Sequence, residues 1–218
     1  GYIQVAFADT STFGGDVTTN NSKVGFSSGS GLLQFNGGED QALTTAAIIS
    51  AQKFILTKPG GLLTTNRQIT IDSVLTLSGG ILSTDSLITL KVAAIVNGGS
   101  NMSHIDENMK KIGNTAFVFP VGDYGHYYPL TITAPSNSTD AFSCRYIYGY
   151  HNESDSTDTT LSYISKCAYW ELNRVTGSSN VKVTLSWDSL GCSIFDTAGV
   201  TIANWDGTRW RNLGNAGI

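Results

Sequence analysis

Charged residues are scarce in this sequence. They make up 14% of its 218 residues, against about a quarter in ordinary soluble domains, and Ser, Thr, Asn and Gly fill the gap. Amphipathic helices need a charged outer face, so this composition disfavours a helical protein and favours short strands joined by many turns. Hydrophobic residues still reach 40%, which is enough for a packed core and excludes a disordered chain.

Basic residues and long apolar runs are also few. Lys and Arg total 13 against 17 Asp and Glu, and Lys110-Lys111 is the one adjacent basic pair. Nucleic-acid binding depends on clustered cations, so we expect none. No stretch approaches the roughly 20 apolar residues of a membrane-spanning helix, so we expect no membrane insertion. No signal peptide is visible at the N-terminus.

Cysteine occurs three times, as Cys144, Cys167 and Cys192, without a C-x-x-C pair. Cys167 and Cys192 flank a predicted hairpin with its turn at 176–179, and we expect a disulfide between them. Such a bridge would contribute about 3 kcal/mol to stability and would fit an oxidising compartment. Two reduced, partly buried thiols are the alternative. Cys144 lies on the apolar face of a predicted strand and is expected to be a packed core thiol.

The most informative feature is a repeat with a spacing of 19 residues. The repeated pieces are 60–63 (GGLL) with 79–82 (GGIL), 69–71 (ITI) with 88–90 (ITL), and 74–75 with 93–94, while 98–99 (GG) begins a third copy. A period near 20 with short strands predicts a parallel β-solenoid, or β-helix, whose coils stack about 4.8 Å apart. The glycines would occupy corners that need left-handed backbone.

The same spacing predicts which apolar side chains stack inside the solenoid. The predicted columns pair Leu63 with Leu82, Ile69 with Ile88, and Ile71 with Leu90. A leucine-rich repeat is the main rival at this period, but it needs an Asn or Cys at a fixed place after each L-x-L strand, and none is found. Ordinary hairpins whose glycines coincide are the second alternative.

The pattern changes after residue 115, where longer strands alternate apolar and polar residues. Phe142, Cys144 and Tyr146 share one face of a predicted strand, and Val183 and Leu185 share one face of another. Apolar and polar residues that alternate at every second position are typical of an antiparallel sheet with one solvated side. Further strands are expected at 116–120, 128–134 and 168–174, together with a hairpin at 205–210 that turns at its Asp-Gly pair.

The sequence therefore predicts an all-β protein, with a short parallel β-solenoid followed by an antiparallel β-sandwich. We expect an N-terminal β segment or solenoid cap at 1–45, solenoid coils at 46–110 and the sandwich at 111–218. The segment 214–218 ends on turn residues, so we expect the sandwich to be truncated and the chain to be a fragment of a longer protein.

Patterns of catalytic or metal-binding residues are missing. His104, His126 and His151 do not have zinc-site spacing, and neither a G-x-S-x-G elbow nor a P-loop occurs. A polysaccharide-degrading solenoid needs charged residues along several coils, and the repeated coils carry few: Lys58, Arg67, Asp72, Asp85 and Lys91. We expect no enzyme, no metal and no cofactor.

Aromatic residues gather in the second half of the chain. Those on alternating strand positions are expected to pack in the core or across strands. Tyr124 and Tyr127 lie in a predicted loop instead, and they are the weak candidates for a ligand site, where they would stack on sugar rings.

Several segments of the chain resemble repeat-bearing surface proteins of Bacteroidota. The resemblance covers about residues 55–215, and its motifs are 60–99, 110–113 (KKIG), 116–123 (AFVFPVGD), 169–174 (YWELNR), 183–187 (VTLSW) and 205–210 (WDGTRW). It implies a secreted protein of the type IX system at the cell surface or outside the cell, with an adhesin, filament or matrix role. No C-terminal sorting domain is visible.

The resemblance also implies O-glycosylation at Asp-Ser and Asp-Thr pairs that a small or aliphatic residue or Thr follows. The candidate acceptors are Ser73, Ser86, Ser156, Thr159, Ser189 and Thr197. The alternative is that Asp-Ser and Asp-Thr pairs are simply good turn formers.

We therefore expect an extracellular structural or adhesive surface protein, with a fibre subunit as one form of it. Its partners would be further copies, other surface proteins or a polysaccharide. A carbohydrate-binding module of a larger secreted protein is the alternative, and a polysaccharide-active enzyme is the third reading. The sequence leaves open the ligand, the oligomeric state and calcium binding in the loop at 155–158.

Overall fold

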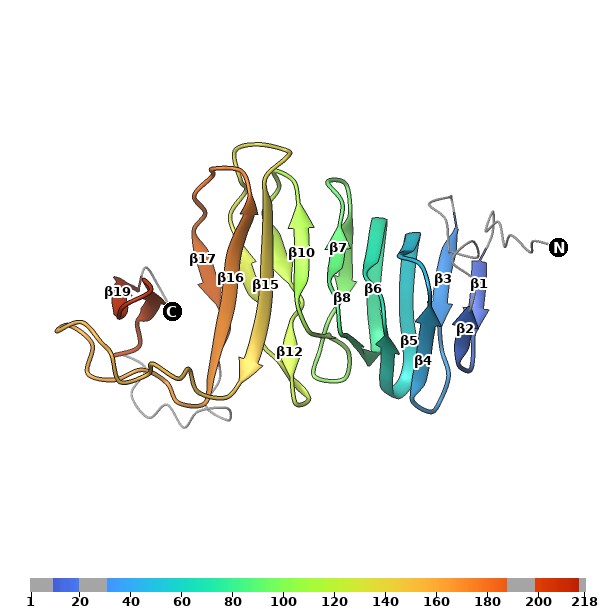
Figure 1. The fold of residues 1–218 in the computed structure, drawn as a ribbon, viewed down its shortest axis with the longest axis horizontal. Coiled ribbons are helices and arrows are strands. Elements are labelled where there is room, and N and C mark those ends of the chain that lie inside the picture. The colour runs from blue at the N-terminus through green and yellow to red at the C-terminus, as the bar shows by residue number, and fades with distance from the viewer. Residues whose placement is uncertain (1–9, 20–30, 188–198, 216–218) are drawn as a thin grey trace. The chain divides into compact units, whose positions relative to one another are not determined.

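The computed structural model describes residues 10–19, 31–187 and 199–215. These residues form strands and turns and contain no helix, hence none that could cross a membrane (Figure 1). The chain divides into two compact units, residues 1–146 with 170–186 and residues 147–169 with 187–218. The all-β prediction is confirmed.

The first unit contains a parallel β-solenoid of about four turns, in which strands stack in three ladders (Figure 1). The first ladder consists of β1 (Thr10–Phe13), β3 (Leu32–Phe35), β5 (Ile49–Thr65), β6 (Ile69–Thr84) and β8 (Ile95–Gly98). The second consists of β2 (Val17–Thr19), β4 (Gln41–Thr45), β5, β6 and β9 (Ile105–Asp106). The third consists of β5, β6, β7 (Ile88–Leu90) and β10 (Met109–Ile112). Strands β1 to β4 thus continue the ladders into the segment 10–45.

The predicted 19-residue register is confirmed on two ladders. Leu63 lies opposite Leu82, Ile69 opposite Ile88, and Ile71 opposite Leu90. All six side chains are fully buried, because inward positions of successive coils form continuous apolar columns. These six residues therefore belong to the solenoid core, as the repeat predicted.

The predicted alignment of Val74 and Leu75 with residues 93–94 is wrong. Val74 lies opposite Ile95, and Leu75 opposite Val96, a spacing of 21 residues. The cause is a turn at 91–94, closed by a hydrogen bond from the Ala94 N–H to the Lys91 carbonyl at 3.0 Å. This turn lengthens the connection between β7 and β8, so one fixed period does not describe every side of the coil.

Phenylalanine rings stack along the first ladder. The ring centroids of Phe13 and Phe35 are 5.3 Å apart, and those of Phe35 and Phe54 are 5.5 Å apart. Phe35 and Phe54 are fully buried, whereas Phe13, in β1, is partly exposed. The stack therefore continues to the first described coil.

A corner of the solenoid encloses a buried lysine. Lys58 is 2% exposed, and its Nζ donates to the Gly37 carbonyl (3.0 Å), the Glu39 carbonyl (2.5 Å) and Gln41 Oε1 (3.0 Å). Burial lowers the pKa of the Lys58 ammonium, against the pull of nearby carboxylates. Gly80 has a φ of 81°, and a Cβ there would lie 2.8 Å from Lys58 Cβ, so this corner accepts only glycine.

Antiparallel strands follow the last coil. β15 (Ala141–Tyr148) pairs with β10 and is followed by β16 (Ala168–Thr176) in the same sheet. A second sheet contains β11 (Phe117–Phe119), β14 (Leu130–Ile132) and β17 (Val183–Leu185). A small hairpin joins β12 (Gly122–Asp123) to β13 (His126–Tyr127). The strands predicted after residue 115 are thus present, and β11, β14, β15 and β17 form antiparallel pairs.

Lys111 lies in β10, the strand of the last coil in the third ladder, and its side chain is buried. Its buried Nζ donates to the carbonyls of Lys91 (2.7 Å), Val92 (2.8 Å) and Ile112 (3.0 Å). The same nitrogen lies 5.6 Å from the centroid of the Phe117 ring, in β11. Burial lowers the pKa of Lys111 to about 8. The side chain connects the turn at 91–94 to the three-stranded sheet.

The second unit contains the predicted hairpin, formed by β18 (Ile202–Trp205) and β19 (Trp210–Gly214). Asp206 closes its turn: Oδ1 accepts from the Thr208 hydroxyl (2.7 Å) and from the N–H groups of Thr208 (2.8 Å) and Arg209 (2.9 Å), and Oδ2 accepts from Arg211 Nε at 2.6 Å. These bonds hold the pKa of the Asp206 carboxyl well below its usual range.

We predict that Ile69→Ala lowers the free energy of unfolding by about 2–5 kcal/mol, because it removes a fully buried side chain from a column and leaves a cavity. The control is Ile48→Ala, where the side chain is 57% exposed and the change should stay within about 0.5 kcal/mol. Urea unfolding followed by circular dichroism measures both. Equal effects of the two substitutions would contradict the solenoid register.

Candidate functional site

Two carboxyl groups meet where the last coil adjoins the β12–β13 hairpin. Ile105, in β9, forms a parallel bridge with Val121, and its N–H donates to the Pro120 carbonyl at 2.9 Å. Asp106 directly follows Ile105 and Asp123 lies two residues after Val121, so the bridge brings them near each other, and a hydrogen bond to Asp123 is one influence on the pKa of Asp106. Two carboxyl groups can share a hydrogen bond only when one of them carries a proton.

The surroundings of Asp106 favour that proton. Burial raises the pKa of Asp106 to about 6, with further increases from the charges of Asp123 and Glu107 and from the hydrogen bond to Asp123, while Arg145 acts in the opposite direction. Both carboxyl residues are partly exposed, so protons of the solvent can reach the pair. The Asp106 carboxyl can therefore take up and release a proton near pH 6.

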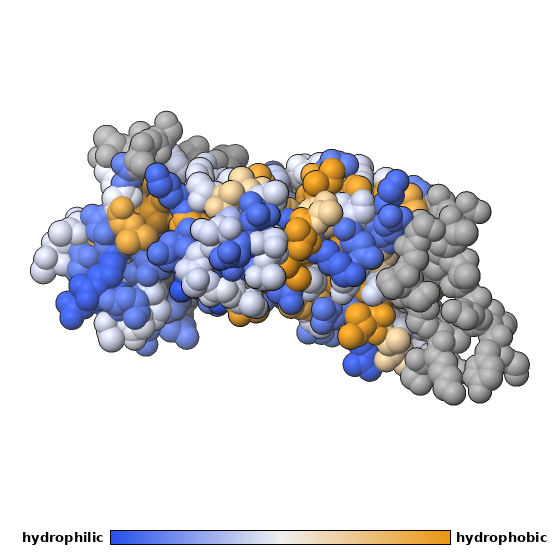
Figure 2. Space-filling view, turned by 90° about the horizontal axis from the view of Figure 1, so that it is seen from above, coloured by the Kyte–Doolittle hydropathy of each residue, from blue (hydrophilic) through white to orange (hydrophobic). Residues whose placement is uncertain are grey.

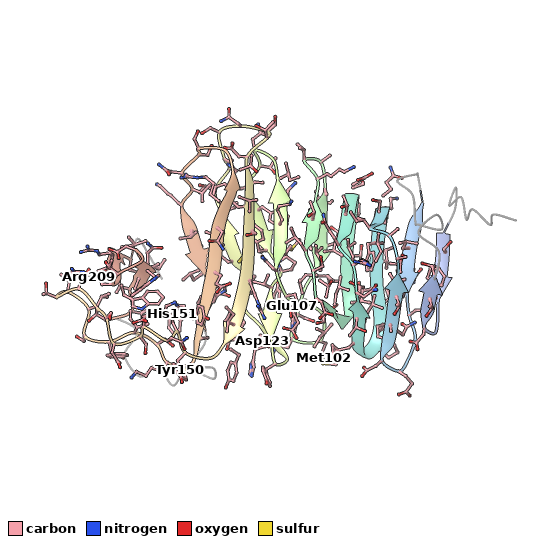
Figure 3. The ribbon with its side chains drawn as sticks, in the orientation of Figure 1. Met102, Glu107, Asp123, Tyr150, His151 and Arg209 are labelled. Carbon is pink, nitrogen blue, oxygen red and sulfur yellow. The ribbon has the colours of Figure 1, made fainter. Side chains whose placement is uncertain are left out.

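Glu107, which Figure 3 labels near Asp123, and Arg145 complete the charged cluster. Glu107 Oε2 lies 3.4 Å from the Arg145 guanidinium, which β15 supplies. Burial raises the pKa of the Glu107 carboxyl, Arg145 lowers it, and the charges of Asp123 and Asp85 raise it again. The cluster therefore holds several acidic groups and one cation at the same edge of the solenoid.

A buried histidine lies next to the cluster. The Nδ1 atom of His104 is 3.1 Å from the Ser100 carbonyl, so this nitrogen donates, and its Nε2 has no hydrogen-bond partner among the described residues. Burial lowers the pKa of His104 and keeps the ring neutral. A Cβ on Gly122 would lie 2.6 Å from His104 Cδ2. The ring therefore fills the space that a side chain at position 122 would need.

The candidate ligand residues Tyr124 and Tyr127 lie on the β12–β13 hairpin, but their environments differ. Tyr124 is 79% exposed and has a φ of 52°, a left-handed conformation that a bulky residue rarely adopts. Tyr127 is partly buried, its N–H donates to Asn101 Oδ1 at 2.8 Å, and its ring lies 6.4 Å from that of His104. Burial raises the pKa of the Tyr127 hydroxyl. Tyr124 thus has most of its side chain in contact with solvent, and Tyr127 mainly packs.

A second group of aromatic rings forms in the other unit. The His151 ring lies 5.3 Å from those of Tyr169 and Trp205 and 5.2 Å from that of Trp210. The indole N–H of Trp210 donates to the Glu153 carbonyl at 3.1 Å, and Trp210 is 7% exposed. These contacts make the group the core of a small unit, although Tyr150, next to His151, is 64% exposed (Figure 3).

The predicted glycosylation acceptors have different exposures. Ser86 and Thr159 are exposed, and Ser73 and Ser156 are partly buried. Ser189 and Thr197 lie outside the described residues. Ser86 follows β6 in a turn, where an attached glycan would point into solvent, so it is the best placed of the described candidates. Glycosylation itself stays a prediction.

The structure describes two of the three cysteines, Cys144 and Cys167, and no disulfide joins them. Cys144 is a fully buried free thiol in β15, as expected for a core cysteine, and burial raises the pKa of its thiol. Cys167 is partly buried just before β16. Cys192 lies outside the described residues, so the pairing of Cys167 with Cys192 stays a prediction.

Within the residues that the structure describes, no three His, Cys, Asp or Glu side chains are grouped to hold a metal ion. The carboxylates of the 155–158 loop have other partners: Asp155 binds Lys166 Nζ at 2.9 Å, and Asp158 accepts from Thr160 and from the Asn212 N–H. Exposed apolar side chains form small separate patches on the face shown in Figure 2.

Comparison with known proteins adds no assignment. No protein-family model, no curated protein and no solved structure matches this chain.

We predict that Tyr124→Asn stabilises the protein by up to about 1 kcal/mol, because Asn tolerates the left-handed backbone that Tyr adopts at a cost. The control is Tyr163→Asn, which changes an equally exposed tyrosine whose φ is not positive. Urea unfolding measures the change in the free energy of unfolding for both variants. A loss of stability at position 124 would contradict the left-handed conformation.

Proposed function

We propose that this chain is an extracellular structural or adhesive surface protein, whose solenoid joins further copies or other surface proteins by strand pairing. The observation that carries this function is the edge of the first described coil. β1 pairs with β3, and β2 pairs with β4, and among the described residues neither strand pairs on its other side. Such an edge is a template for another strand.

The backbone of β1 indicates which groups would accept that strand. The Asn36 N–H donates to the Phe13 carbonyl at 3.1 Å, so the peptide groups of Phe13 face β3. Because successive residues of a strand direct their N–H and C=O groups to alternate sides, those of Thr12 face away from β3. The side chain of Thr12 is exposed, so it does not anchor the coil.

The end of the phenylalanine stack supports the same function. Phe35 and Phe54 are fully buried between coils, whereas Phe13 is partly exposed. A further coil on the outer side of β1 would bury more of this ring, and removing apolar surface from water favours association by about 25 cal/mol per Å². Backbone pairing and ring burial would thus act together.

Contacts among the antiparallel strands support a β-sandwich as part of this proposal. We propose that β10, β15 and β16 form one layer, and that β11, β14 and β17 form the other. The ring of Tyr128, next to β14, lies 4.9 Å from that of Tyr146 in β15 and 6.5 Å from that of Trp170 in β16. The indole N–H of Trp170 also donates to the Tyr128 carbonyl at 2.9 Å. These contacts cross from one sheet to the other.

A bacterial surface origin in Bacteroidota, export by the type IX system and O-glycosylation belong to the same proposal. The sequence resemblance and the exposed acceptors Ser86 and Thr159 support them.

We predict that Thr12→Pro abolishes self-association and leaves the fold intact, because proline removes the outward N–H that an incoming strand needs. Thr12→Ala is the control, since it keeps that N–H and should associate like the parent protein. Sedimentation velocity over a range of concentrations and negative-stain electron microscopy measure assembly. Monomers of the parent protein at high concentration would overturn the assembly function, as would full assembly of the proline variant.

A carbohydrate-binding module is the second candidate, and the exposure of Tyr124 favours it. An exposed aromatic ring beside carboxylates is suited to stack on a sugar and to accept its hydroxyl hydrogens. Under this function Tyr124→Asn would lose glycan binding while the fold stays intact, and Tyr163→Asn would keep it. Under the structural function neither variant changes assembly.

A further inference from the structure

Asparagine is followed by glycine at two places in the chain, Asn36-Gly37 and Asn97-Gly98, and a further glycine follows each pair. Such a pair is chemically reactive, because glycine has no side chain to hinder attack of its amide nitrogen on the asparagine side chain. Both asparagines are exposed near the end of a solenoid strand: Asn36 directly follows β3, and Asn97 lies in β8. The local sequences are therefore alike, and the structure distinguishes the two pairs.

The amide of Gly98 lies at an open strand edge. Among the described residues β8 pairs with β6 alone, with Leu77 opposite Gly98, and the Gly99 N–H donates to the Leu77 carbonyl at 3.1 Å. In a parallel pair both peptide groups of a residue face the same side, and successive residues alternate. Because those of Gly99 face β6, the N–H of Gly98 faces away from it. Gly98 is exposed, so its nitrogen is accessible.

The amide of Gly37 is held in the corner that encloses Lys58. Its N–H donates to Gln41 Oε1 at 3.0 Å, and the same oxygen accepts from Lys58 Nζ at 3.0 Å. Gly37 is buried, and a Cβ there would lie 2.5 Å from the Gly14 carbonyl oxygen. The Gly37 amide is therefore both bonded and enclosed.

We propose that Asn97 is a site of spontaneous deamidation in the folded protein, and that the structure protects Asn36 from the same reaction. The Gly98 nitrogen forms a bond to Cγ of Asn97, and the bond between Cγ and Nδ2 breaks. The proton of the Gly98 amide leaves with Nδ2 as ammonia, and a cyclic succinimide remains. Water then opens the ring, at the side-chain carbonyl to give aspartate or at the main-chain carbonyl to give isoaspartate.

The two sites differ in the contacts that the attack must break. At Asn97 the peptide group before Gly98 has to turn, which breaks the ladder bond of the Asn97 carbonyl to β6. At Asn36 the Gly37 N–H would also have to leave Gln41 in an enclosed corner. A buried donor without its partner lowers the population of the reactive conformation by about tenfold to a hundredfold. We therefore expect Asn97 to react at least about tenfold faster than Asn36.

The product changes the edge of the first ladder at β8. Aspartate adds a negative charge at position 97, and isoaspartate also adds a carbon atom to the backbone, which disturbs the register with β6. A charge on an edge strand opposes pairing with a further strand. The modification thus acts against strand addition at this edge, and the reaction itself does not depend on whether the chain assembles.

The test is peptide mapping by mass spectrometry after incubation of the folded chain at pH 8, with samples taken over several weeks. Conversion appears as the mass increase from amide to acid, and electron-transfer fragmentation distinguishes aspartate from isoaspartate. The peptide with Asn97 should convert at least about tenfold faster than the peptide with Asn36. Conversion should be slower in a parallel series at pH 6, because the attacking amide nitrogen must lose its proton.

The chain unfolded in guanidinium chloride is the matched control, since it keeps both local sequences and removes the structure. Asn36 and Asn97 should then convert at similar rates. Asn97→Gln is the second control, because the longer side chain would have to close a larger ring, and position 97 is exposed enough to accept it. This variant should retain its amide at position 97 in the folded protein.

Two results would overturn the proposal. The first is retention of the Asn97 amide in the folded protein throughout the incubation. The second is conversion of Asn36 in the folded protein as fast as that of Asn97, since the Gly37 contacts would then give no protection.

Discussion

The parallel backbone ladder is the constraint on which the rest of the structure depends. Each coil pairs in register with its neighbours, so that side chains of one column point inward together. A slip of one residue would turn every inward side chain outward, which fixes the register wherever the core is apolar. The same register places Lys58 inside a corner beside Gly80, and it places Asp106 at the end of a ladder next to Asp123.

Much of the ladder could be predicted because a stacked fold repeats its sequence wherever its geometry repeats. The 19-residue spacing gave the partners of Leu63 and Ile69 correctly. It failed at Val74, because the extra turn at 91–94 carries no repeated residue that would reveal it. The burial of Lys58 could not be predicted, since nothing in the sequence shows that three polar acceptors converge on a lysine inside the coil.

The candidate site was harder to predict from the sequence. Asp106 and Asp123 are separated by the whole of β10 and β11, and they meet only because β9 pairs beside the segment at 120–121. The exposure of Tyr124 was foreseen from its loop, but its left-handed backbone was not. A two-residue turn between paired strands, with glycine second, is the signal that could have shown it, because such turns need positive φ at both central positions.

The register between β6 and β8 distinguishes the observed ladder from a uniform repeat, and disulfide trapping measures it directly. In the structure Thr76 lies opposite Asn97, whereas a constant 19-residue period would place Thr76 opposite Ile95. Adjacent parallel strands bring paired Cα atoms to about 4.8 Å, within the range that a disulfide needs. The account predicts that the Thr76→Cys/Asn97→Cys variant forms an intramolecular bond on mild oxidation, identified by peptide mass mapping, and that Thr76→Cys/Ile95→Cys does not. Preferential bonding of the second pair would contradict the register and the solenoid built on it.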